Sequence, residues 1–124
     1  MLDAKSVAIS TSASGVYLAN ELFPQLGIAG EMKEKSRQTP AGVRVAEYLA
    51  SGQADLGFQQ VSELSHFPGI DYVGPLPADI QSYTMFSSGI VAGAKEADAA
   101  KALVKFITSP AAAGAYKKRG MEPG

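Results

Sequence analysis

The sequence predicts an α/β fold with a mixed sheet of about five strands and flanking helices. Short apolar runs alternate with amphipathic stretches along the chain, which is typical of this fold class. The length of 124 residues suits one domain, and such a chain buries about two-thirds of the surface that it exposes when unfolded. Hydrophobic residues at 46% and charged residues at 19% indicate a folded protein rather than a disordered one.

The first strand and the first helix are predicted near the N-terminus. The apolar run at residues 6–10 predicts a buried strand, and a loop rich in serine and threonine follows at 10–15. Pro24 strains the last turn of the helix after this loop, and Gly27 ends it. The apolar face of this helix consists of Val16, Ala19, Leu22, Phe23 and Leu26.

The middle of the chain predicts a second helix between short strands. Thr39 and Pro40 indicate its start, since a hydroxyl cap precedes a proline at the first helical position, and Gly52 ends it. The neighbouring elements are a short helix at 29–33, a weak edge strand at 35–38, a strand at 56–60 and a helical turn at 61–64.

The last third predicts two strands and two helices. The strands lie at 70–73 and 83–92. An apolar stripe of Ala100, Leu103, Val104 and Ile107 predicts one helix, and Ser109 with Pro110 begins the other. The earlier helices already cover the faces of the predicted sheet, so the stripe at 100–107 needs another apolar surface.

Charge and residue content exclude several classes of function. Eleven basic and twelve acidic residues give a net charge of −1, which does not indicate binding to nucleic acid or to an anionic membrane. The chain has no cysteine and one histidine, so we expect no cofactor and no metal centre. No apolar segment reaches the about eighteen residues of a membrane span, and no secretory signal peptide is visible.

Two loops that precede helices are candidate anion sites. The loop at 10–15 offers the hydroxyls of Ser12 and Ser14 beside the free amides of a helix start, where the helix dipole favours negative charge. Residues 39–43 form a second helix start, with exposed amides around Gly42. The alternative in both loops is that the hydroxyls only cap the helix. Neither loop has a nucleotide-binding glycine pattern.

Other polar residues give weaker signals for chemistry. Gln59 and Gln60 end a strand, and at most one of them faces a cleft because consecutive strand residues point in opposite directions. A triad of Ser14, His66 and Asp71 lacks the sequence pattern of a nucleophile elbow. The other carboxylates are scattered, so we predict that the chain is not an enzyme, with a hydrolase as the alternative.

Four stretches of the sequence carry a resemblance to a known family. They are ASGVYLANELFPQLGI at 13–28, VAEYLASGQADLGFQQ at 45–60, VGPLP at 73–77 and AKALVKFITSPAAAGAYKKRGMEP at 100–123. This set resembles bacterial extracellular solute-binding proteins, and within them the molybdate-binding-protein-like group of the type II periplasmic binding protein fold. The resemblance implies a three-layer lobe and covers only the later half of the family's chain.

The resemblance also implies a division of the chain and a ligand site. Residues 1–79 correspond to the second, ligand-binding lobe, and residues 80–124 to a return strand and terminal helices that help to complete the first lobe. Gln60 stands where molybdate binders carry a tyrosine, so the expected ligand is another small oxyanion or a small polar solute. With the two loops above, the predicted ligand-binding residues are Ser12, Ser14, Gly42, Val43 and Gln60.

The role implied by the resemblance is solute capture for a bacterial ABC importer. The expected partner is the transporter permease, and the expected location is periplasmic or extracellular. The alternative is a sensory or interaction module that forms a homodimer, with exchanged segments, through the surface left by the absent first lobe.

Overall fold

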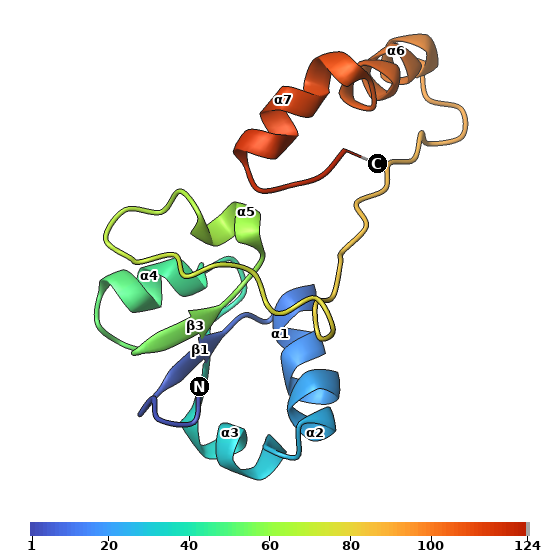
Figure 1. Cartoon of the computed structure of the whole chain (residues 1–124). Helices are drawn as coiled ribbons and strands as arrows, with labels where there is room; N and C mark the ends of the chain where they lie inside the picture. Colours follow the sequence, from blue (N-terminus) through green and yellow to red (C-terminus); the bar gives the residue numbers. More distant parts are fainter. Residues whose placement is uncertain (124) are drawn as a thin grey trace. The chain divides into compact units, whose positions relative to one another are not determined.

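The computed structural model describes residues 1–123, which fall into two compact units (Figure 1). Unit 1 is Met1–Thr84, and unit 2 begins at Met85. The functional division that we expect at residues 79 and 80 stays a prediction.

Unit 1 is built on a parallel sheet with the strand order β2-β1-β3. The strands are β1 (Val7–Ile9), β2 (Ser36–Gln38) and β3 (Leu56–Phe58). In the register, Ala8 of β1 lies opposite Arg37 of β2 and Gly57 of β3. All residues of β1 are buried, as its continuous apolar run predicts for a central strand.

The prediction of about five strands in a mixed sheet is wrong. The described residues form a three-stranded sheet, and both strand pairs are parallel. Residues 70–73 and 83–92 are irregular. Val73 is 92% exposed, and Pro75 and Pro77 follow it without an N–H to donate. An apolar run forms a strand only where another strand is available to pair its backbone groups.

One helical run follows β1, as predicted, but it contains a wider turn. It consists of α1 (Ala13–Tyr17), the π-helical turn η1 (Leu18–Leu22) and α2 (Phe23–Gln25). The wider turn precedes Pro24, which lacks an N–H and whose ring interrupts the regular hydrogen bonds. Gly27 ends the run with a φ of 70°, and the N–H of Ile28 donates to the carbonyl of Phe23 at 3.0 Å.

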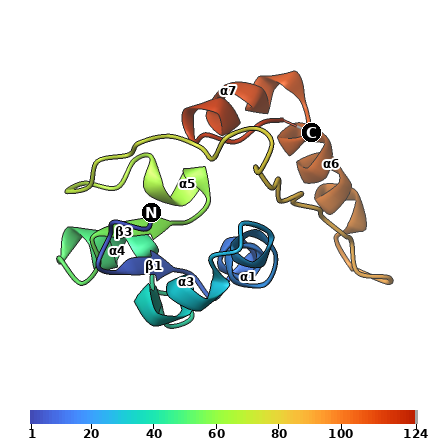
Figure 2. The same cartoon turned by 60° about the horizontal axis from the view of Figure 1, so that its bottom comes forward.

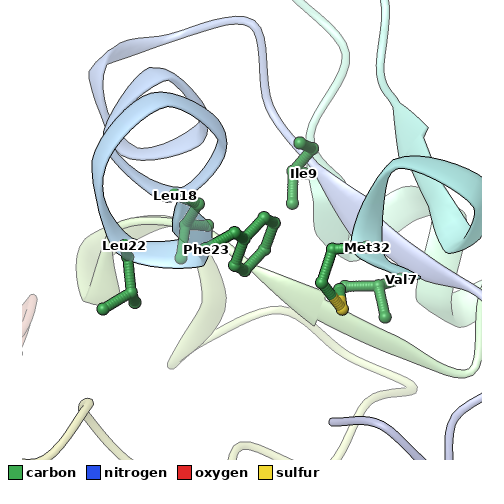
Figure 3. Packing of buried hydrophobic residues seen from close by; sticks show 6 residues of the cluster. All are labelled: Val7, Ile9, Leu18, Leu22, Phe23 and Met32. Atoms are coloured by element: carbon green, nitrogen blue, oxygen red, sulfur yellow. The ribbon is translucent and has the colours of Figure 1, made fainter. Parts of the chain in front are cut away.

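The core of unit 1 has two parts because the side chains of β1 alternate between the faces of the sheet. Val7 and Ile9 face the helical run, and Figure 3 shows them with the other buried members of this cluster, which are Leu18, Leu22, Phe23 and Met32. Ala8 packs with Val45 and Ala54. Val16, Ala19 and Leu26, predicted on the apolar face of the helix, are exposed.

Three further helices complete unit 1. They are α3 (Ala29–Lys35), α4 (Val45–Ala50) and α5 (Val61–Leu64). Met32 of α3 belongs to the cluster around Val7, whereas α4 packs on β1 and β3 beside Ala8 (Figure 2). The helices therefore cover both faces of the sheet.

The helix predicted to start at Thr39 starts at Val45 instead. Thr39 is buried, its N–H donates to the carbonyl of Ile9 at 2.9 Å, and its hydroxyl donates to the carbonyl of Val43 at 3.0 Å. The hydroxyl therefore holds a turn closed instead of capping a helix.

Unit 2 contains the two predicted C-terminal helices, α6 (Ala97–Ile107) and α7 (Pro110–Lys118). The hydroxyl of Tyr116 joins them by donating to the carbonyl of Ile107 at 2.7 Å. Neither helix has a buried residue, and Leu103 and Phe106 of α6 are 61% and 60% exposed.

Candidate functional site

The carboxyl ends of the parallel strands lie at one edge of the sheet in unit 1. Ser10 follows β1, Thr39 follows β2 and Gln59 follows β3. From the central β1 the chain goes first to β2 on one side and later to β3 on the other. In open α/β sheets, ligands bind where the connections diverge in this way.

Three serine hydroxyls meet at the end of β1. The Oγ of Ser10 lies 2.7 Å from that of Ser12 and 3.0 Å from that of Ser14, and the last two are 3.5 Å apart. Ser12 occupies the cap position of α1, but its side chain makes no capping hydrogen bond. The alternative that its hydroxyl only caps the helix therefore has no support. We call these residues the serine cluster.

Gly15 allows α1 to lie directly on the end of β1. A Cβ atom at this position would overlap the backbone carbonyl of Ser10. The N–H of Val16 donates to the carbonyl of Ser12 at 3.0 Å, so the amides of the preceding first turn have no partner within the helix. The close contact thus brings the serine cluster next to the start of α1.

A hollow of about 260 Å³ lies beside the serine cluster. Segments that follow all the strands contribute to its lining, which consists of Ser10, Thr11, Ser12, Gly42, Val43, Arg44, Gln59 and Glu63. Ser12, Gly42 and Val43, predicted from separate loops, are therefore brought together here. We call this space the main hollow.

A second hollow of about 70 Å³ contains the other two predicted residues, Ser14 and Gln60. Tyr17 also lines it, and the hydroxyl of Tyr17 donates to the carbonyl of Ile80 at 2.8 Å. Since Ser12 and Ser14 belong to one cluster, each hollow is lined by at least one hydroxyl group of the serine cluster.

The predicted amide donors at residues 41–43 lie in a turn and not at a helix start. The N–H of Val43 donates to the carbonyl of Pro40 at 3.1 Å, and Gly42 has a φ of 83°. This φ is left-handed, so the turn favours glycine. The amide of Val43 is thus engaged within the chain, and the roles of Gly42 and Val43 in ligand binding stay predictions.

Five lining residues of the main hollow were not among the predicted ligand residues, and three of these five, Arg44, Gln59 and Glu63, contact one another. Arg44 directly precedes α4, and its Nε lies 3.7 Å from Oε2 of Glu63. Gln59 accepts a hydrogen bond from the N–H of Val45 at 2.9 Å and donates to Oε2 of Glu63 at 3.3 Å. The sequence signal for Arg44 was a cation directly after a candidate anion-binding loop.

The structure, like the sequence pattern, gives no support to a Ser14–His66–Asp71 triad. Ser14 lines the smaller hollow, whereas His66 and Asp71 line neither hollow. Within residues 1–123, no group of three or more histidine, aspartate or glutamate side chains is placed to hold a metal ion.

Comparison with known proteins gives a family and one characterised relative. The family model of bacterial extracellular solute-binding proteins matches residues 2–122. An aconitate isomerase from Pseudomonas sp is 43% identical over 120 residues, which are 97% of this chain and 45% of that protein. The chain thus spans about half the length of this relative. No solved structure gave a significant match.

The relative overturns one prediction. A protein that is 43% identical over almost the whole chain is named as an isomerase, so the prediction that the chain is not an enzyme is wrong. An enzymatic role could not be predicted from the sequence because the chain has no recognisable catalytic motif.

The family also bears on location and identity. Its description as extracellular indicates a periplasmic or secreted location. No helix within residues 1–123 combines the length and apolar character that crossing a membrane requires. The family match covers nearly the whole chain and confirms the resemblance carried by the four stretches. The chain belongs to the bacterial extracellular solute-binding protein family.

Proposed function

We propose that the chain supplies half of the substrate site of an isomerase that acts on a small polycarboxylate, with aconitate as the first candidate. The observation that carries the proposal is the serine cluster at the diverging strand ends, directly beside the main hollow. The 43% identical relative, named aconitate isomerase, supports the choice of ligand.

The size and chemistry of the main hollow suit a small anionic molecule. Its volume of about 260 Å³ is just below the about 300 Å³ at which pockets for drug-sized ligands begin. Hydroxyl groups and the amides of a helix start donate hydrogen bonds to a carboxylate, and Arg44 adds a positive charge. An isomerase leaves the composition of its substrate unchanged, so the site has to hold the carboxylates and assist the rearrangement.

The importer role has separate support. Capture of a small solute outside the cytoplasm is supported by the family description. An ABC importer with a permease as partner is proposed only because the resemblance implies it. Such a protein and an isomerase share the need to bind a small solute, so the serine cluster serves either role. An inorganic oxyanion such as molybdate has less support than a carboxylate because Gln60 replaces the expected tyrosine.

The proposal is tested by titration calorimetry with aconitate and by proton NMR of aconitate incubated with the chain. We expect binding to the wild type and a loss of affinity of about fivefold in Ser12→Ala and Ser14→Ala, because each loses a hydrogen-bond donor. Ser88→Ala is the matched control, since Ser88 is exposed and lines neither hollow.

The outcomes separate binding from turnover. Binding with no new aconitate signals in the NMR spectrum supports a half-site that needs the remainder of a longer protein for catalysis. No binding of aconitate overturns the proposed ligand, and equal affinities for Ser12→Ala, Ser14→Ala and Ser88→Ala overturn the role of the serine cluster.

A second candidate function is self-association through unit 2. The favouring observation is that Leu103 and Phe106 are mostly exposed on α6, as are Phe86 and Val91 in the segment before it. Light scattering after size exclusion is expected to show a dimer that becomes a monomer in a Leu103→Gln, Phe106→Gln variant. A wild-type monomer at high concentration contradicts this function.

A further inference from the structure

We propose that Arg44 binds a second carboxylate of the ligand and that the carboxylate of Glu63 competes with it for the guanidinium group. This inference rests on the proposed function, because it assumes that the serine cluster receives the first carboxylate. It makes Arg44 the residue that selects polycarboxylates over monocarboxylates.

The position of Arg44 beside the serine cluster is fixed by the fold. Arg44 precedes α4, whose first N–H is bound by the Oε1 of Gln59 at 2.9 Å. Arg44 and Ser12 both line the main hollow, although they follow different strands of the sheet. A ligand in this hollow therefore meets hydroxyl groups and a guanidinium group together.

The contact between Arg44 and Glu63 leaves most of the guanidinium available. Nε of Arg44 lies 3.7 Å from Oε2 of Glu63, which is longer than a hydrogen bond. Among the described residues, the guanidinium of Arg44 donates no hydrogen bond to another side chain or carbonyl. The side chain is 59% exposed, so the guanidinium nitrogens are accessible to a carboxylate in the paired geometry that arginine favours.

Glu63 is itself held in place by Gln59. The Nε2 of Gln59 donates to Oε2 of Glu63 at 3.3 Å, and the same side chain binds the start of α4. Glu63 thus presents a carboxylate to Arg44, and a ligand carboxylate has to compete with it. Exposed ion pairs of this kind are weak, so the exchange costs little.

The test measures the affinities of aconitate and of succinate, a minimal dicarboxylate, by calorimetry. For both acids we expect Arg44→Gln to bind about tenfold more weakly than the wild type. Arg44→Lys is expected to lose less affinity than Arg44→Gln, because lysine keeps the positive charge although it cannot form the two parallel hydrogen bonds of arginine. Glu63→Gln is expected to bind about threefold more tightly because the competing charge is gone. Arg37→Gln is the control, since Arg37 is exposed, lies on β2 and lines neither hollow.

Each outcome decides between the two proposals. If the wild type binds and Arg44→Gln matches Arg37→Gln, the inference is overturned while the proposed function stands. Weaker binding of Glu63→Gln than of the wild type also overturns it, because Glu63 is then no competitor. Binding of succinate alone, weakened by Arg44→Gln, supports the inference and refutes aconitate as the ligand. Binding of neither acid overturns both. Circular dichroism confirms that each variant is folded.

Discussion

Unit 1 and unit 2 differ in how they use apolar residues. In unit 1 the buried hydrophobic residues lie between Val7 and Leu64 in the sequence, and they pack the helices against the sheet. In unit 2, α6 and α7 contain no buried residue, and Leu103 and Phe106 lie exposed. The same amphipathic pattern therefore gives a core in one unit and an uncovered apolar surface in the other, because burial needs a second surface to pack against.

This difference agrees with the sequence-based expectation that the apolar stripe of α6 needs a further surface to pack against. Its stripe at 100–107 predicts a helix, which the structure confirms, and it requires an apolar surface that the described part of unit 2 does not provide. Matched substitutions in unit 1 and unit 2 are therefore expected to differ in their effects on stability.

The largest difference is expected between two glycines that lie in helices. Gly15→Ala would place a Cβ atom on the carbonyl of Ser10, so we expect unit 1 to lose about 3 kcal/mol or more of unfolding free energy. Gly114→Ala in α7 meets no atom within 4 Å and is expected to stabilise that helix by about 0.5 to 1 kcal/mol. Urea denaturation followed by circular dichroism measures both. Equal effects would show that α1 does not lie on β1 as described.

A smaller difference is expected between two leucines. Leu22 is 0% exposed in the core of unit 1, and Leu22→Ala is expected to cost about 3 kcal/mol because it leaves a cavity. Leu103→Ala is expected to change stability by less than about 0.5 kcal/mol, since the side chain is already in contact with solvent. Denaturation at low protein concentration makes this comparison. A large loss in Leu103→Ala would indicate that α6 is covered in solution.

The smallest difference in stability is expected between two hydroxyls that the sequence marks as caps. Thr39→Val removes a buried hydrogen bond to the carbonyl of Val43 and is expected to cost about 1 kcal/mol. Ser109→Ala removes an exposed bond to the carbonyl of Phe106 and is expected to cost less than about 0.5 kcal/mol. Thermal unfolding of both variants gives the ranking, and the reverse order would contradict the buried position of Thr39.

Hydrogen exchange compares the two units in the unmodified chain. The amides of β1 are expected to exchange more slowly than those of α6, because buried strands open only with the whole unit whereas exposed helices open locally. Mass spectrometry of peptides from the two regions measures the rates. Equal protection would indicate that unit 2 has a core.

The candidate site was predictable where its residues are close in the sequence. Ser12 and Ser14 were recognised because a polar loop between a strand and a helix is visible in ten residues of sequence. The presence of Arg44 and Ser12 in the same hollow was not predictable. It depends on the order of the strands in the sheet and on the turn closed by the hydrogen bond from the N–H of Val43 to the carbonyl of Pro40. The need for glycine at position 15 could not be predicted either. It depends on the angle between α1 and β1, which places the Cα of Gly15 against the carbonyl of Ser10.

The sequence by itself determined the α/β class, the central strand β1, the amphipathic helices and the membership of the solute-binding family. These features follow from local periodicity and from residue patterns along the chain. The tertiary structure alone decided that three strands pair, that Thr39 closes a turn and that the serine cluster shares a hollow with Arg44. The physical reason is that pairing, burial and convergence need partners distant in the sequence, and no local pattern specifies where those partners lie.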